Sequence, residues 1–276
     1  MYRIFVLSVL KYTLNTNLTN ILTKKEENIN MRMKKKKYGN ERLQLLGELL
    51  VTDVKNFIEN KDKIYNSTEP LRIEIGCGKG DFIKGKSVKE PNYCYLAIEK
   101  ILDVCVLAVE NYAKSRDMGD LASNGGWQTS NGEIYPLGSD SIHFEKEELG
   151  NVRFTIGDAK ELIALLPDNS VESIYINFCD PWSKKGHAKR RLTYIEFLKM
   201  YSRVLKPDGK LYFKTDNRPL FDFSLEEIEK SPFTLEYHTF DLHNSEMNSQ
   251  NIETEYERNF SAKGFSINML IAKNNK

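Results

Sequence analysis

The sequence has few cysteines, almost no net charge and no long hydrophobic run. Its four cysteines, Cys77, Cys94, Cys105 and Cys179, form no C-x-x-C pair and no other zinc-ligand spacing. This pattern argues against a disulfide framework, and we expect no metal. A chain of this kind belongs in a reducing compartment, so we expect a cytoplasmic protein.

The balance of charge is close to neutral, with 40 Lys and Arg against 39 Asp and Glu. Any affinity for nucleic acid must therefore come from local clusters of cations. The apolar stretch of residues 4–10 is too short to span a membrane, and no convincing cleavage site follows it. We expect neither a membrane span nor a signal peptide.

Residues 1–33 are rich in Asn, Thr and Lys and end beside a basic run at 34–37. We interpret them as a leader that is disordered or not translated, with Met31 as an alternative start. A basic arm that touches RNA is the functional alternative. The rest, residues 34–276, is predicted to form a single domain.

Strand patterns alternate with helical patterns from Leu71 onward. This alternation predicts an α/β, Rossmann-like fold with a mostly parallel seven-stranded sheet and helices on both faces. The last two strands are expected to form an antiparallel pair, and a Pro-x-Gly turn at 207–209 is expected to lead into the fifth strand. The predicted strands are 71–76, 93–99, 152–159, 171–178, 210–216, 233–242 and 265–273.

Two further segments lie outside this alternation. Apolar residues at helical spacing from Glu41 to Ile58 predict one amphipathic helix before the sheet. Residues 118–150 are crowded with Gly, Ser, Asn and Asp, which favours a flexible insertion without elements of its own.

The stretch "EIGCGKG" places Gly76 and Gly78 directly after the first strand, where glycine lets the backbone approach a ligand. A dinucleotide site is disfavoured because Asp81 would repel a diphosphate. S-adenosylmethionine carries an ammonium and a sulfonium instead, so it is compatible with an acidic loop. The loop is a weak signal taken alone.

Carboxylates also end the second and third strands. Glu99 lies about twenty residues after the loop, where it can accept hydrogen bonds from ribose hydroxyls. Asp158 ends the third strand, where adenine would be recognised. Their structural alternatives are a helix N-terminal acid and a helix N-cap, respectively. Strand-end acids around one glycine loop favour the cofactor site.

The stretch "NFCDPWSKKGHAKRR" combines Asp180 with a run of cations. Pro181 restricts Asp180 towards an extended backbone, and Trp182 is either a base-stacking surface or a core residue. Cys179 is interpreted as a buried strand residue, because no base is identifiable for a thiol nucleophile.

The cations that follow Asp180 precede a helix, where positive charge opposes the helix dipole. Stability alone does not explain them, whereas phosphate contact does. Thr193 and Glu196 are predicted to form a capping box that opens this helix. The cationic side chains are Lys184, Lys185, Lys189, Arg190 and Arg191.

With these motifs in hand, the sequence resembles the tRNA (guanine-N7)-methyltransferase family, a group of class I S-adenosylmethionine-dependent enzymes. The resemblance runs from about Arg72 to Phe265. It rests on "EIGCGKG", "AIE", "GDA", "NFCDPWSKKGHAKRRLTY", "FKTDN" and "TEYE". Gly186 and Ser183 depart from residues that are frequent in the family.

The resemblance implies a role for each matching residue. Asp180 would be the catalytic residue, and the substrate would be the guanosine at position 46 in the tRNA variable loop. Cofactor contacts are implied for Glu74, Gly76, Gly78, Glu99, Asp158 and Asp180. Contacts with the target guanosine are implied for Lys184, Asp216, Thr254, Glu255, Tyr256 and Glu257. RNA contacts are implied for Gly186, His187, Ala188, Lys189, Arg190 and Arg191.

Guanine N7 already has an in-plane lone pair, so methyl transfer needs alignment more than proton abstraction. We expect Asp180 and Asp216 to orient the purine, and either Trp182 or Tyr256 to receive the flipped base.

Two alternative functions remain. One is an exocyclic amino-methyltransferase, because "DPW" partly matches the Asn/Asp-Pro-Pro-aromatic loop of that class. The other is an RNA-binding module with an inactive cofactor pocket.

Overall fold

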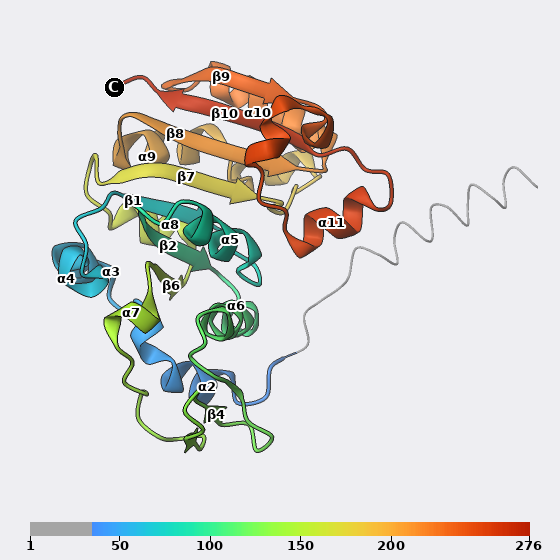
Figure 1. The fold of residues 1–276 in the computed structure, drawn as a ribbon. Coiled ribbons are helices and arrows are strands. Elements are labelled where there is room, and N and C mark those ends of the chain that lie inside the picture. Colours follow the sequence, from blue (N-terminus) through green and yellow to red (C-terminus); the bar gives the residue numbers. More distant parts are fainter. Residues whose placement is uncertain (1–34) are drawn as a thin grey trace, which may run out of the picture. The chain divides into compact units, whose positions relative to one another are not determined.

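A mostly parallel sheet of seven strands organises the chain (Figure 1). The computed structural model describes residues 35–276, so the predicted leader and Met31 lie outside the described residues. The order across the sheet is β6-β2-β1-β7-β8-β10-β9, and β10 is antiparallel to both of its neighbours. The strands are β1 (Leu71–Ile75), β2 (Cys94–Glu99), β6 (Val152–Ile156), β7 (Val171–Asn177), β8 (Leu205–Thr215), β9 (Phe233–Thr239) and β10 (Asn268–Asn274).

All seven predicted strands and the antiparallel final pair are confirmed. β8 begins earlier than predicted, because Leu205 already pairs with Val171 before the register shifts to Lys210 and Ser173. The expected turn is therefore an irregularity within β8, where Asp208 has a φ of 61°. The interior of each strand is almost wholly buried in β1, β2 and β7, as a sheet covered on both faces requires.

Helices cover both faces of the sheet. One face packs its apolar residues with α3, α8, α9 and α10, and the other packs with α2, α5 and α6. The longer helices are α5 (Asp81–Lys89), α6 (Leu102–Ser115), α9 (Ile195–Val204) and α10 (Arg218–Glu229). The shorter ones are α2 (Gly39–Leu45), α3 (Val54–Glu59), α4 (Lys61–Tyr65), α7 (Lys146–Leu149), α8 (Ala159–Ala164) and α11 (Glu255–Ser261). Within residues 35–276, no helix combines the length and apolar character that crossing a membrane requires.

The single helix predicted over residues 41–58 is wrong. The chain forms α2, the 3-10 turn η1 (Gly47–Leu49) and α3 instead. Tertiary pairing interrupts the helix, because the Val51 amide donates to the Phe154 carbonyl at 2.7 Å. Asp53 then starts α3 as an N-cap that accepts from the amides of Lys55 and Asn56.

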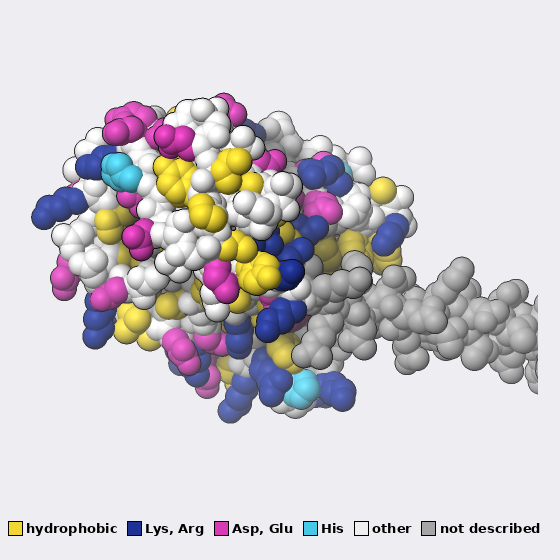
Figure 2. Space-filling view, turned by 90° about the horizontal axis from the view of Figure 1, so that it is seen from below, with side chains coloured by type: hydrophobic (Ala, Val, Ile, Leu, Met, Phe, Trp, Pro, Cys, Tyr) yellow, Lys and Arg dark blue, Asp and Glu magenta, His cyan; other side chains and the backbone are white. Residues whose placement is uncertain are grey.

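The prediction of an insertion without elements at 118–150 is also wrong. A three-stranded antiparallel sheet forms from β3 (Asp120–Leu121), β4 (Trp127–Gln128) and β5 (Ile134–Tyr135). Trp127 is 2% exposed and donates from its indole nitrogen to the Met118 carbonyl at 3.1 Å. This buried tryptophan belongs to the apolar cluster that includes residues of α2 and α6, so it anchors the polar segment to the main core. On the face drawn in Figure 2, hydrophobic side chains lie among charged ones.

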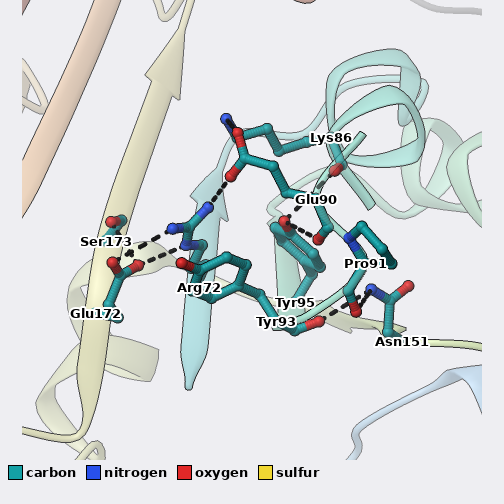
Figure 3. Close-up of polar contacts among 9 residues, drawn as sticks. All are labelled: Arg72, Lys86, Glu90, Pro91, Tyr93, Tyr95, Asn151, Glu172 and Ser173. Carbon is teal, nitrogen blue, oxygen red and sulfur yellow. Dashed lines mark hydrogen bonds and ion pairs between the residues drawn. The ribbon is translucent and has the colours of Figure 1, made fainter. Parts of the chain in front are cut away.

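A buried cation ties α5 to the sheet (Figure 3). The Arg72 guanidinium on β1 contacts the carboxylates of Glu172 and Glu90 and lies 3.2 Å from the centre of the Tyr93 ring. Glu90 follows α5 and Glu172 lies on β7. The end of α5 is thus fixed against β1 and β7, which positions the loop before α5.

Candidate active site

The loop after β1 forms an open turn. Gly76 and Gly78 have φ angles of 73° and 56°, and a Cβ built at either would have no heavy atom within 4 Å. Positive φ strains other residues, so glycine is required for this path. The space in front of the loop can receive a ligand close to the backbone.

Glu74 provides an acceptor that lacks a donor. Its side chain is buried, and its Oε1 accepts from the Asn177 amide at 3.0 Å. Among the described residues, its Oε2 has no hydrogen-bond partner. Burial raises the pKa of this carboxyl to about 8. Buried polar atoms are normally paired, and a cationic ligand group at this oxygen, such as the ammonium of S-adenosylmethionine, would lower the pKa again by favouring the carboxylate form.

Glu99 fixes the neighbouring loop. Its two carboxylate oxygens accept from the amides of Gly78 at 3.0 Å and Ile101 at 2.9 Å. Burial raises its pKa above the ordinary value, although these hydrogen bonds oppose the shift. A carboxylate has about four acceptor sites, so two remain for ribose hydroxyls.

Asp158 follows β6, beside Glu99 at the end of the neighbouring strand β2. It caps α8 through the Lys160 amide at 2.9 Å and forms an ion pair with Lys100 at 2.8 Å. The hydrogen bond from Lys100 lowers the pKa of Asp158. Asp158 is therefore a helix N-cap, as its structural alternative predicts. Each of its carboxylate oxygens still has an acceptor site for a cofactor contact.

Asp180 lies beside the glycine loop because β1 and β7 are parallel neighbours whose residues Ile75 and Ile176 pair. The chain leaves β7 through Phe178, at a φ of 53°, and Trp182 has a φ of 43°. Positive φ at two bulky residues stores strain of the kind that concentrates at functional sites. Asp180 is exposed, and its charge acts on Glu99 and on Tyr256.

Cys179 follows β7 rather than lying within it, and it is half-buried, so its assignment to a strand is wrong. Burial raises the pKa of its thiol to about 12. A thiol that stays protonated is a poor nucleophile.

The basic run forms a 3-10 turn, η2 (Lys185–Arg190), which includes the small residues Gly186 and Ala188. The cationic side chains of the run differ in what they contact. Arg191 donates to the carbonyls of Pro181 and Trp182, both at 3.1 Å, so it clamps the loop that carries Asp180. Arg190 lies 4.9 Å from the Trp182 ring centre. Lys184, Lys185 and Lys189 are exposed.

The environment of Trp182 differs from that of a free stacking surface. His187 meets its ring edge-on at 5.7 Å while Arg190 lies over it, and the ring is half-buried. Tyr256 is 42% exposed and its hydroxyl lies 3.5 Å from both Asp216 oxygens. Burial raises the pKa of Asp216.

The predicted capping box at Thr193 and Glu196 is wrong. α9 begins at Ile195, after Tyr194, and no side chain caps it. Thr193 is buried and contacts the Ser224 hydroxyl on α10 at 2.7 Å. The Ile195 amide donates instead to Glu227 at 2.8 Å. A long-range carboxylate thus replaces the local cap.

The segment 254–257 opens α11, and its side chains have different environments. The Thr254 hydroxyl caps the helix by accepting from the Glu257 amide at 3.0 Å, and Glu255 pairs with Lys79 at 2.7 Å. Glu257 is fully buried and pairs with Lys214. The exposed Tyr256 is the member of this segment best placed to meet a base.

Sequence reasoning missed the contacts by which three residues assemble the site. Asp81 accepts from the Glu255 amide at 2.9 Å and so joins α5 to α11. Asn177 holds Glu74, and Lys214 holds Glu257. Asn177 and Lys214 also line a cavity of about 200 Å³ with Phe82. A polar residue inside a buried strand was the available signal for the last two.

One cluster in the described chain has metal-ligand types. His243, Glu253 and Glu257 bring their ligand atoms within 4.8 Å of one another. The Glu257 oxygens already accept from Lys214 and Asn251, both at 2.7 Å. We interpret the cluster as a hydrogen-bonded ion-pair network.

Comparisons with known proteins agree with this geometry. A family model described as "Putative methyltransferase" matches residues 68–270. A tRNA (guanine-N(7)-)-methyltransferase of Listeria innocua is 35% identical over 243 residues, which cover 88% of this chain and 98% of the relative. The enzyme of the same name from Lachnoclostridium phytofermentans is 39% identical over 210 residues, covering 76% and 83%.

Two solved structures share the fold. A structure of an antibiotic-related methyltransferase has a TM-score of 0.52 at 17% identity and covers 84% of this chain and 99% of its own. The 16S rRNA methyltransferase KamB also has a TM-score of 0.52, at 9% identity, with 79% and 94% covered. The predicted Rossmann-like class I methyltransferase fold is confirmed. The chain therefore belongs to the tRNA (guanine-N(7)-)-methyltransferase family of S-adenosylmethionine-dependent enzymes.

Proposed function

We propose that this protein methylates N7 of a guanosine in tRNA, at position 46 of the variable loop, in the cytoplasm. The names of its relatives support the chemistry. The observation that carries the proposal is the juxtaposition of Asp180 with an open glycine turn and the unpaired Oε2 of Glu74. The exposed cations after Asp180 supply the affinity for tRNA.

The cofactor, S-adenosylmethionine, supplies an electrophilic methyl group on a sulfonium. Glu74 would hold the ammonium, Glu99 the ribose hydroxyls and Asp158 the adenine. Gly76 and Gly78 leave the space for these contacts. None of the residues needs to remove a proton first, because the N7 lone pair is free. The site would then catalyse the reaction by aligning the methyl group with guanine N7 in a preorganised electrostatic field.

Two carboxylates would orient the guanine. Asp180 and Asp216 can accept from its N1–H and exocyclic amine, and their charge would stabilise the positive charge that the purine acquires. Burial raises the pKa of Asp216, and a purine that gains positive charge beside it would lower that pKa again by favouring the carboxylate. The Tyr256 hydroxyl beside Asp216 would fix that carboxylate and place its own ring against the base. Lys184 would meet the adjacent phosphate or ribose.

The direct test is to incubate the purified chain with labelled S-adenosylmethionine and unmodified tRNA. The expected product is N7-methylguanosine, mapped by chain cleavage at the modified nucleotide. Label on an exocyclic amine would instead support the amino-methyltransferase alternative. If the protein binds tRNA but neither binds the cofactor nor transfers a methyl group, the result would support an RNA-binding module.

The role of Asp180 has a matched control. Asp180→Asn is expected to lower kcat by about 10²- to 10³-fold, as the loss of one transition-state contact does. Asp222→Asn changes an exposed carboxylate on α10 that pairs only with Arg218 among its described contacts. This variant should keep full activity. Equal activities of the two variants would contradict the role of Asp180.

A further inference from the structure

Four aromatic rings form a row that starts at the candidate active site. Phe178 follows β7 and lies 5.0 Å from Tyr256, measured between ring centres. Tyr256 stacks on Phe260, one turn later on α11, at 4.2 Å and 16°. Phe260 in turn lies 5.7 Å from Phe265. We call Phe178, Tyr256, Phe260 and Phe265 the aromatic row.

The two ends of this row differ in what surrounds them. Near the inner end, Tyr256, the second ring of the row, has its hydroxyl beside the Asp216 carboxylate. At the outer end, Phe265 is 47% exposed, and the Lys263 ammonium lies 4.9 Å from the centre of the Phe260 ring. Hydrogen-bond acceptors therefore lie at the inner end and a cation lies near the outer end.

Phe265 follows α11, and the helix does not need this exposed ring to hold it in place. The helix is already fixed by the buried Glu257, by the Asp81 cap and by the Glu255–Lys79 ion pair. A large apolar ring left half in water, next to other rings and beside a site, is typical of a surface that is covered when a ligand binds. The rings and the cation together match an unstacked nucleotide, which offers a flat base and a phosphate.

We propose that the aromatic row is a stacking surface for tRNA and that Phe265 carries the base of a nucleotide flanking the target guanosine. The target base contacts the exposed edge of Tyr256, whose ring packs between Phe178 and Phe260, while the flanking base lies on Phe265 and its phosphate meets Lys263. The neighbouring nucleotide is thereby held unstacked, which keeps the target out of its own stack. This proposal rests on the proposed function, since it extends the same site outward.

The test is the variant Phe265→Ala, with tRNA affinity and methyl transfer measured separately. Loss of one stacked base is expected to raise the KM and the Kd for tRNA by about 5- to 150-fold. The Kd for S-adenosylmethionine and the thermal midpoint should stay at their wild-type values. Phe265→Trp should restore affinity, whereas Phe265→Leu, which is apolar without a flat ring, should not.

Phe240 offers a matched control, because it is 40% exposed and packs edge-on against Phe221 of α10, outside the aromatic row. Phe240→Ala is expected to leave tRNA affinity unchanged. Equal losses in the two alanine variants would overturn the inference, and so would an unchanged affinity in Phe265→Ala. A change in the sedimentation of Phe265→Ala with unchanged tRNA affinity would show that a second copy covers the ring, which also overturns it.

Failure of this inference and failure of the proposed function are distinguishable. A wild-type protein that does not methylate guanine N7 in tRNA refutes the function. A wild-type protein that does so, with an equally active Phe265→Ala variant, refutes only the stacking role.

Discussion

The Lys214 ammonium lies 2.7 Å from the Glu257 carboxylate, and the two side chains are 3% and 0% exposed. Lys214 lies near the end of β8 and pairs with the β7 residue Asn177, whose amide holds Glu74. Glu257 lies on α11. His243 and Asn251 also contact Glu257, and Lys214 donates to the Ile252 carbonyl. This pair therefore joins the sheet beneath the cofactor site to the helix that carries Tyr256.

We expect Glu257→Gln to destabilise the protein, because it leaves the Lys214 charge buried without its counter-ion. Removing one partner of a buried pair typically costs about 3–5 kcal/mol, and Gln should lie at the lower end. The double variant Lys214→Met, Glu257→Met should lose less free energy of unfolding than the sum of the losses in the single variants Lys214→Met and Glu257→Met. Urea unfolding measures all of these free energies. Strictly additive losses would contradict a coupled pair.

Glu74 predicts an unusual dependence of stability on pH. Its pKa rises from 4.5 in the unfolded chain to about 8 in the folded protein, mainly through burial. Between these values the folded protein holds a proton that the unfolded chain has lost. The free energy of unfolding should therefore fall as pH rises through this window, by up to about 1.4 kcal/mol per pH unit from this group.

The measurement is cofactor-free unfolding of the wild type and of Glu74→Gln at several pH values from 5 to 8. The variant cannot titrate at this position, so its stability should depend less steeply on pH. Parallel profiles of the two proteins would refute the raised pKa of Glu74.

The sheet was predictable because its information is local. β1, β2, β6 and β7 are short, mostly apolar runs that end in, or lead into, a glycine or polar residue, and the helices between the strands give the parallel order. The glycine loop and the strand-end acids were found for the same reason. Parallel strands bring their carboxyl ends to one edge, so Glu74, Glu99 and Asp158 gather there.

The rest of the site depends on contacts between distant residues. Asp81 and Glu255 are 174 positions apart, and nothing near either of them indicates that α11 docks on α5. The basic run predicts phosphate contact for Arg191, and nothing in the local sequence indicates that its Nε and Nη2 donate to the carbonyls of Pro181 and Trp182. The 41–58 segment had helical spacing, yet pairing of Val51 with Phe154 overrode it.

The small sheet at 118–150 yields a prediction about stability. Trp127→Ala should cost about 3–5 kcal/mol of unfolding free energy, as loss of a buried large aromatic does. Ile134→Ala, on the neighbouring strand but 55% exposed, should change it by less than about 0.5 kcal/mol. Similar small effects in both variants, measured by thermal or urea unfolding, would mean that the segment contributes no core.

The basic run predicts two separable effects. Lys189 and Arg190 are exposed, so Lys189→Ala, Arg190→Ala should weaken tRNA binding and make its salt dependence shallower. Two phosphate contacts correspond to a loss of about 1.4–1.8 in the log-log slope. Arg191→Ala should instead lower kcat and leave the slope near the wild-type value, because this side chain holds the Asp180 loop. Binding measured at several salt concentrations, together with steady-state kinetics, separates the two. A slope that falls equally in Arg191→Ala would place its guanidinium on the RNA.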